Sequence, residues 1–130
     1  MVLSLRIAVA DDHPDMREYY QEVLPRLGHR VVVAASNGCE LVEQCQTAEP
    51  DLIISDINMP EMDGVTAVAT LCRERRIPVI FVSANQHWDL SVCAELGVVL
   101  GRVDKPIKLS ELQLMIARAL SYVEPEGKAV

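Results

Sequence analysis

Long apolar runs are missing from this 130-residue sequence. None approaches the roughly 20 apolar residues that a membrane-spanning helix needs. Residues 1–6 also lack the charged start and the apolar stretch that are typical of a signal peptide. We therefore expect a cytoplasmic protein that makes no contact with a membrane.

Basic residues are few and scattered. The sequence holds 12 Lys and Arg against 19 Asp and Glu, which gives a net charge of −7. The one basic run, Arg73, Arg75 and Arg76, is short and is interrupted by Glu74. Because a nucleic-acid surface needs clustered Lys and Arg to contact phosphates, we expect no direct binding to nucleic acid.

Paired cysteines are missing too. The four cysteines form no CxxC pair, and no histidines stand near them at metal-binding spacing. Three of the four fall at apolar positions of helical patterns. We interpret them as reduced thiols in the core.

Five short apolar runs, rich in β-branched residues, alternate with amphipathic helical patterns. The runs lie at residues 5–10, 31–34, 52–54, 79–82 and 98–100, and the helical patterns at 16–27, 41–48, 65–72, 90–96 and 109–123. Pro14 suits a first helical turn and Gly28 a helix end, with a kink or an early end expected at Pro25. Runs that are apolar on both faces indicate parallel strands covered by helices.

This alternation predicts one domain with a flavodoxin-like α/β fold, a doubly wound (βα)5 unit. The five-stranded parallel sheet is expected in the order 2-1-3-4-5 with helices on both faces. We place the domain at residues 1–123. Residues 124–130 show no periodicity and are expected to be a flexible tail or the stub of a linker.

Acidic and polar residues stand where four of the predicted strands end. They are Asp11 and Asp12, Ser55 and Asp56, Ser83, and Asp104 with Lys105. In an open α/β sheet the carboxyl ends of the strands form the ligand site, so these side chains should converge. Any one of these acids alone is better explained as a helix cap or a solvated loop residue. The whole set on one rim is not.

Three carboxylates in one cleft repel one another by about 4 kcal/mol per pair at ~4 Å and an effective dielectric near 20. Lys105 offsets part of that repulsion, and a divalent cation would offset the rest. Hard oxygen ligands indicate Mg²⁺. An oxygen nucleophile, a metal, a lysine and a hydroxyl are what phosphoryl transfer requires. Asp56 is the best candidate nucleophile, with Asp11 and Asp12 assigned to the metal.

These residues resemble a known family. The acid pair Asp11–Asp12, the run DLIISDINMPEMDG at residues 51–64, the segment VSA at 82–84 and Lys105–Pro106 are similar to the receiver domain of response regulators. The resemblance covers roughly residues 5 to 123. It implies that Asp56 accepts phosphate from the phosphohistidine of a sensor histidine kinase or a phosphotransfer protein.

The resemblance also implies the remaining roles. Asp12 and Asp56 would ligate Mg²⁺ directly, Asp11 through water, and Asn58 through its backbone carbonyl. Ser83 would move onto a phosphoryl oxygen, and Lys105 would pair with the acyl phosphate. Pro60 and Gly64 would shape the loop after the acceptor, and Pro106 would follow a cis peptide bond.

The implied protein is a switch and not a turnover enzyme. Its downstream partner would be an effector protein or an output domain outside this sequence. Two alternatives remain open. An aspartyl-phosphate phosphatase of the haloacid dehalogenase type needs a second Asp two residues after the nucleophile, where this sequence has Asn58. A pseudo-receiver would bind partners without being phosphorylated.

Two departures from the family concern the last strand. Arg102 stands three residues before the lysine, where the family usually has Tyr or Phe, and residues 97–101 are one residue longer than expected. Because a guanidinium is costly to bury without a partner, we expect Arg102 at the surface, near Asp104 or Glu111. His13, beside the acid pair, is interpreted as an exposed residue at a helix start, with metal tuning as the alternative.

Overall fold

The computed structural model describes residues 4–84 and 98–129, with side chains up to residue 121. Five strands form one parallel sheet in the order β2-β1-β3-β4-β5, as predicted. The strands are β1 (Arg6–Ala10), β2 (Arg30–Ala35), β3 (Leu52–Asp56), β4 (Val79–Ser83) and β5 (Val99–Asp104). The sheet order places β3, and with it Asp56, at the centre of the sheet.

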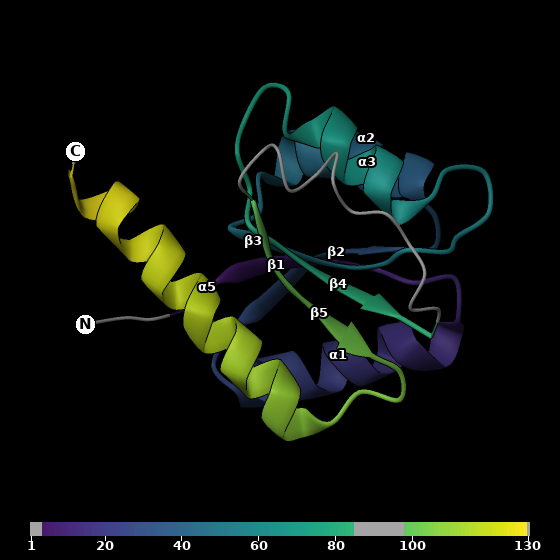
Figure 1. Cartoon of the computed structure of the whole chain (residues 1–130), viewed down its shortest axis with the longest axis horizontal. Coiled ribbons are helices and arrows are strands. Elements are labelled where there is room, and N and C mark those ends of the chain that lie inside the picture. Colours follow the sequence, from purple (N-terminus) through teal and green to yellow (C-terminus); the bar gives the residue numbers. More distant parts are fainter. Residues whose placement is uncertain (1–3, 85–97, 130) are drawn as a thin grey trace.

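Helices cover both faces of this sheet. They are α1 (Pro14–Arg26), α2 (Gly38–Ala48), α3 (Gly64–Leu71) and α5 (Leu109–Ala129). Figure 1 shows α2 and α3 together on one face, and α1 and α5 on the other. The predicted flavodoxin-like fold is confirmed by this arrangement. The helix predicted at residues 90–96 lies outside the described residues. No helix in the described part of the chain is both long and apolar enough to cross a membrane.

Each face of the sheet has its own core, because successive strand residues point to opposite sides. Ile53 and Phe81 pack toward α2 and α3, whereas Ile54 and Val82 pack toward α1 and α5. All four side chains are fully buried. Burial on both faces is the reason that the strand sequences are continuously apolar instead of alternating.

The helix boundaries follow local hydrogen bonds more closely than the apolar pattern does. Helix α2 begins at Gly38, three residues before the first apolar position. Asn37 caps it by accepting the Glu40 N–H (2.8 Å), and the Glu40 carboxylate accepts the Ser36 N–H (2.8 Å). This reciprocal arrangement satisfies donors that would otherwise lack partners. In α1, Pro25 lies in the last turn, and the helix ends one residue later, which agrees with the predicted early end.

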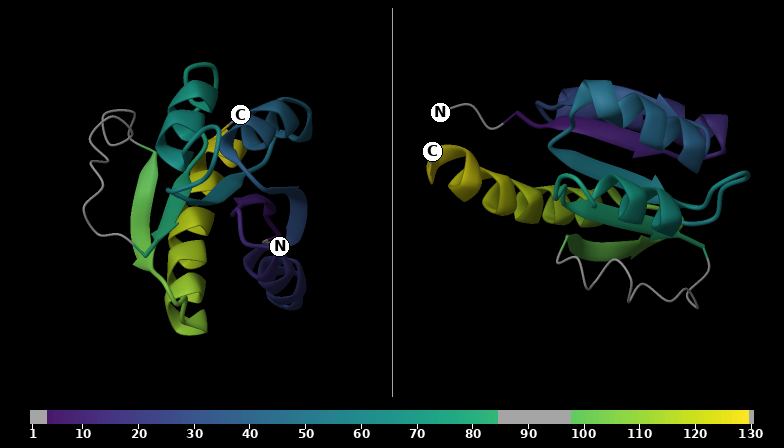
Figure 2. Two further views of the ribbon diagram at one scale, coloured as in Figure 1. Left: turned by 90° about the vertical axis from the view of Figure 1, so that its right-hand side faces the viewer. Right: turned by 90° about the horizontal axis from the view of Figure 1, so that it is seen from above.

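The last helix is longer than the apolar pattern indicates. Helix α5 continues to Ala129 and extends beyond the sheet, as Figure 2 shows, whereas we expected regular structure to stop at residue 123. Helical backbone bonds are local and do not require an apolar face, so loss of periodicity does not by itself end a helix. The domain boundary at residue 123 and the flexibility of the tail stay predictions.

A buried histidine connects the residue before β1 with the residue before β2. The Nδ1 atom of His29 accepts the Leu5 N–H at 3.0 Å, and burial lowers the pKa of His29. A protonated ring has no lone pair at Nδ1 for this bond. The neutral ring therefore stabilises the fold above the ordinary pKa of histidine, and this contribution is lost as the pH falls toward the lowered value.

We expect the free energy of unfolding to fall between about pH 7 and about pH 5, and to fall less steeply in His29→Asn. The Asn amide oxygen can take the place of Nδ1 as the acceptor but does not titrate in this range. Urea denaturation at several pH values measures both slopes. Equal slopes in the two proteins would show that His29 is not the group responsible.

Candidate functional site

The acid pair follows β1 directly. The Asp11 side chain is fully buried, and its Oδ1 accepts the His13 N–H at 2.9 Å. The Asp12 side chain is 34% exposed and faces the solvent side of the same turn. The Asp11 N–H donates to the Ala35 carbonyl oxygen at 3.0 Å, so β2 also helps to fix the position of the pair. The first strand thus delivers one buried and one accessible carboxylate.

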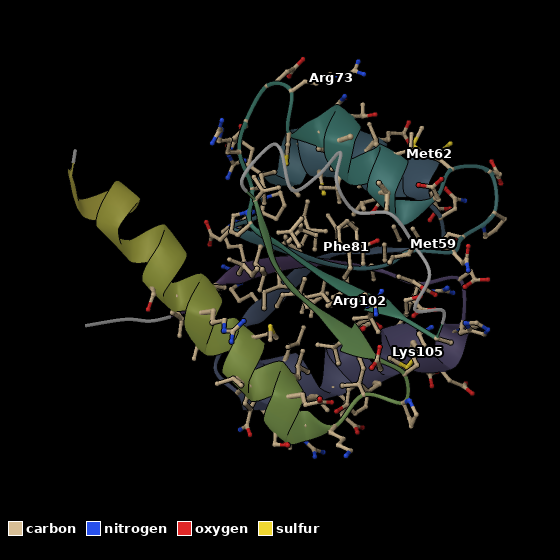
Figure 3. All side chains as sticks on the ribbon, viewed as in Figure 1. Met59, Met62, Arg73, Phe81, Arg102 and Lys105 are labelled. Atoms are coloured by element: carbon tan, nitrogen blue, oxygen red, sulfur yellow. The ribbon has the colours of Figure 1, made fainter. Side chains whose placement is uncertain are left out.

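Asp56 and Lys105 meet across the sheet. Asp56 is the last residue of β3, and Lys105 follows β5 in the turn that contains the cis Lys105–Pro106 peptide bond. The Lys105 Nζ lies 2.9 Å from Asp56 Oδ2 and 3.0 Å from Asp11 Oδ2. One ammonium group therefore bridges two buried carboxylates. Figure 3 shows Lys105 where β5 ends.

The remaining predicted site residues line the same pocket. It is bounded by Asp12, His13, Asp56, Asn58, Ser83, Ala84 and Lys105. Asp11 is not one of the lining residues, but its buried carboxylate contacts the lysine that is. The backbone of Lys105 is fixed to β4 by its N–H, which donates to the Ser83 carbonyl oxygen at 3.1 Å. Five of the expected residues therefore line one pocket: Asp12, Asp56, Asn58, Ser83 and Lys105. Ser55 and Asp104, which were also expected to converge there, do not line it: the Ser55 Oγ donates to the Asp56 carbonyl oxygen, and Asp104 is exposed beside Arg102.

The loop after Asp56 is shaped by two glycines. The Gly64 N–H donates to the Ile57 carbonyl oxygen at 2.8 Å, and a Cβ at Gly64 would collide with the Asp56 backbone oxygen. The Gly38 N–H donates to the Met62 carbonyl oxygen at 2.9 Å, and a Cβ at Gly38 would collide with that oxygen. The start of α2 therefore holds the loop that carries Asn58.

Burial and neighbouring charges shift the pKa values of Asp56 and Lys105 in opposite directions. Burial raises the pKa of Asp56, as does the charge of Asp11, while Lys105 lowers it; the net shift is upward. Burial alone would lower the pKa of Lys105, but its contacts with Asp56 and Asp11 outweigh that effect and raise it. Burial is the largest cause of the upward shift in the pKa of Asp56, and Lys105 offsets only part of it.

The donor set fits a hard divalent cation. Ligand atoms of Asp11, Asp12, His13 and Asp56 all lie within 4.8 Å of one another. Asp11 Oδ2 is buried and has no hydrogen bond in the described part of the chain, although the Lys105 ammonium faces it. Carboxylate oxygens in this number are the ligands that Mg²⁺ selects. The cluster could therefore bind a metal ion.

His13 is more closely involved than its sequence position indicated. Its side chain is 66% exposed, as expected, yet Nδ1 lies 3.1 Å from Asp11 Oδ1 and 3.2 Å from Asp12 Oδ1. The signal that could have shown this is the direct succession Asp-Asp-His. A turn in which the Asp11 carboxylate accepts the His13 N–H folds the histidine back over both acids.

The hydroxyl of Tyr20 lies in the core on the α1 side of the sheet. It is fully buried, and no hydrogen-bond partner is found for it among the described residues. Burial, together with the charges of Asp11 and Asp56, raises the pKa of Tyr20. A buried hydroxyl without a partner costs free energy.

We expect Tyr20→Phe to raise the free energy of unfolding by about 1 kcal/mol, because the ring stays and only the unsatisfied hydroxyl is lost. Chemical denaturation measures the change. A loss of stability of about 1 kcal/mol or more would instead show that the hydroxyl makes a favourable interaction, such as one with a buried water.

The two departures in β5 have visible structural consequences. The pairing with β4 shifts between Val79↔Val99 and Ile80↔Gly101, so that Leu100 has no partner in this register. Such a shift accommodates one unpaired residue in one of two neighbouring strands. Arg102 is opposite Phe81; its side chain is 26% exposed, and its Nη2 lies 3.9 Å from Asp104 Oδ1. Figure 3 shows Arg102 on β5 and Lys105 at the end of the same strand.

The sheet order and the acidic rim define an α/β domain of the flavodoxin-like type with a candidate cation site at the ends of β1 and β3. A family model described as "Response regulator receiver domain" matches residues 7–117. The chain belongs to this family.

Curated relatives agree with this assignment. The chain is 44% identical to the chemotaxis protein CheY of Bacillus subtilis over 92% of this chain and all of that protein. It is 31% identical to the transcriptional regulatory protein PdtaR of Mycobacterium tuberculosis over 95% of this chain and 62% of PdtaR. It is 41% identical to a protein-glutamate methylesterase/protein-glutamine glutaminase of Carboxydothermus hydrogenoformans, but spans only 28% of it.

Solved structures show the same fold. The response regulator domain of Thermotoga maritima CheB superposes with a TM-score of 0.78 at 27% identity, covering 91% of this chain and 97% of that domain. The N-terminal domain of a three-domain response regulator from Carboxydothermus hydrogenoformans gives 0.81 at 25% identity, covering 93% and 98%. The chain is thus a receiver domain of the two-component response regulator type.

Proposed function

We propose that this receiver domain is a phosphorylation-controlled switch in which Asp56 accepts a phosphoryl group. The observation that carries the proposal is the placement of the Asp56 carboxylate. It lies in a pocket, 2.9 Å from the Lys105 ammonium and within 4.8 Å of the acid pair. The pocket therefore brings together a nucleophilic oxygen, a fixed cation and a candidate metal-binding cluster, which are the groups that phosphoryl transfer needs.

Asp12, Asp56 and the backbone carbonyl of Asn58 would hold Mg²⁺ directly, and Asp11 would hold it through water. The ion, when bound, neutralises charge on the phosphoryl oxygens. A carboxylate oxygen of Asp56 attacks the phosphorus of a phosphohistidine. The P–N bond breaks, and its electrons leave with the imidazole of the donor, which takes up a proton.

Lys105 and Ser83 would then hold the product. Lys105 pairs with the new acyl phosphate through the ammonium that already contacts Asp56. The hydroxyl of Ser83, a buried residue that lines the same pocket, would donate to a phosphoryl oxygen. Movement of Ser83 and of the chain near it toward the phosphate would change the surface that a partner reads. Arg102, weakly paired with Asp104, would report the change by exchanging its ion-pair partner and not by burial.

The partners of this switch would be a sensor histidine kinase or phosphotransfer protein upstream and an effector protein or output domain downstream. Receiver domains of this family act with such partners. The net charge of −7 gives no support to direct binding of nucleic acid. A cytoplasmic location stays a prediction. The domain would act as a phosphoacceptor that dephosphorylates itself slowly and not as a turnover enzyme.

Incubation with acetyl phosphate and Mg²⁺, followed by intact mass spectrometry, tests the proposal. A receiver gives one stable phosphate adduct. Continuous release of inorganic phosphate without an adduct would instead identify a phosphatase. No adduct and no release would identify a pseudo-receiver.

The metal assignment predicts two opposite effects of Asp12→Ala. Mg²⁺ affinity should fall at least about tenfold, while the metal-free protein should become more stable by about 1 kcal/mol because repulsion among the acids is relieved. Calorimetric titration and urea denaturation measure the two effects. Asp15→Ala, an exposed acid outside the cluster, is the control and should leave Mg²⁺ affinity within about twofold. A metal-free Asp12→Ala protein that is less stable by more than about 1 kcal/mol would make Asp12 a structural acceptor.

A further inference from the structure

His13 places a nitrogen donor at the rim of the acidic cluster. Its Nδ1 atom is 3.1 Å from Asp11 Oδ1 and 3.2 Å from Asp12 Oδ1. The same ring and the carboxylates of Asp11, Asp12 and Asp56 offer four ligand atoms within 4.8 Å of one another. The ring is therefore close enough to bind directly to an ion in this cluster.

The turn that carries His13 is held by hydrogen bonds in which the imidazole ring takes no part. His13 is the residue that precedes α1, but its side chain makes no capping bond to the helix. Its N–H donates to Asp11 Oδ1 at 2.9 Å, and Arg17 Nη1 donates to the Asp11 carbonyl oxygen at 2.8 Å, so both bonds hold the turn at Asp11. With 66% of the side chain exposed, a hydrated ion can reach the ring from solvent.

Imidazole nitrogen and carboxylate oxygen select different ions. Mg²⁺ takes oxygen ligands and keeps several waters, so it has little use for an imidazole. Late first-row divalent ions such as Ni²⁺ and Zn²⁺ bind imidazole well, and their affinity for mixed nitrogen and oxygen sites exceeds that of the earlier ions. A site with three carboxylates and one imidazole therefore treats these two classes of ion differently.

We propose that His13 is a nitrogen ligand of this site for late first-row divalent cations, and that it sets the preference of the site among metals. Nδ1 replaces one water of the ion; any proton on Nδ1 is released or carried on Nε2. The proposal rests on the proposed function only in taking the acidic cluster as the metal site. It adds that a late transition ion competes with Mg²⁺ for the pocket that contains Asp56.

Isothermal titration calorimetry of the tag-free chain with NiCl₂ and with MgCl₂ tests this proposal. We expect the ratio of Ni²⁺ to Mg²⁺ affinity to fall at least about tenfold in His13→Ala. Asp15→Asn is the matched control, because it removes a charge from the same helical turn but offers no ligand to the cluster. It should change the two affinities in the same proportion. With diamagnetic Zn²⁺, the Nδ1 resonance of His13 should shift in nitrogen-detected imidazole spectra.

An unchanged Ni²⁺ affinity in His13→Ala, or a Zn²⁺ titration that leaves the His13 nitrogen resonances in place, overturns the proposal. Equal losses for Ni²⁺ and Mg²⁺ also overturn it, since His13 would then only orient the carboxylates. Phosphate uptake by the wild-type chain with Mg²⁺ is measured separately. A wild-type chain that accepts phosphate but shows no His13-dependent metal preference loses only this inference. One that binds Ni²⁺ through His13 but accepts no phosphate loses only the proposed function.

Discussion

Replacing Asp56 by Asn should lower the rate of phosphate uptake from acetyl phosphate at least about a hundredfold, because an amide is a poor nucleophile and one metal ligand loses its charge. The expected loss is chemical and not structural. Asp56 is buried beside a second acid, and burial already raises its pKa, so a neutral side chain of the same shape suits the metal-free fold. Intact mass after a timed incubation measures uptake.

The matched control is Asp63→Asn in the loop that follows. Asp63 caps α3 by accepting the Thr66 N–H at 2.7 Å, and Asn caps helices equally well. This variant should take up phosphate at a rate within about twofold of the wild type, because its carboxylate lies outside the cluster. Uptake at an unchanged rate in Asp56→Asn would remove Asp56 as the acceptor.

Replacing Lys105 by Ala should destabilise the metal-free protein by about 3 kcal/mol, since breaking a buried ion pair leaves uncompensated charge behind. Here one ammonium group faces two carboxylates, those of Asp11 and Asp56, at 3.0 and 2.9 Å. A divalent ion can replace part of the missing charge, so added Mg²⁺ should restore more stability to the variant than to the wild type. Denaturation with and without Mg²⁺ measures this difference.

Lys108→Ala is the control for the second substitution, because Lys108 is exposed in the same segment. It should change stability by less than about 0.5 kcal/mol. Phosphorylation of Lys105→Ala should remain possible. The conformational response to phosphorylation should be lost, because the ammonium group that pairs with the acyl phosphate is missing. If Lys105→Ala is as stable as the wild type without metal, the two carboxylates do not depend on the lysine, and the charge balance described above is wrong.

The position of the site could be predicted because it follows from strand order. Asp11, Asp56, Ser83 and Lys105 come from segments that are far apart in the sequence, but each stands where an apolar run ends. Parallel strands present these ends at one edge of the sheet. The strands could be recognised because their sequences are continuously apolar, as strands buried on both faces are. The rules for connecting parallel strands then left few possible strand orders.

What could not be predicted depends on local geometry. The register shift at Leu100 is visible only in the pairing of β4 with β5. The early start of α2 results from the capping bonds between Asn37 and Glu40, which precede the apolar pattern. The contacts of His13 with the acid pair depend on a turn of the backbone. In the last two cases hydrogen bonds between near neighbours decide the structure, and the apolar pattern carries no information about them.

The close approach of Gly38 to Met62 has a consequence for protein engineering. The loop that carries Asn58 takes its shape partly from a backbone bond to α2, a helix that precedes it in the sequence. A graft of residues 56–64 onto another flavodoxin-like scaffold would therefore transfer the acceptor but not the support of its loop. The graft would have to include a side-chain-free residue at the equivalent helix start, so the smallest transplantable unit is discontinuous in sequence.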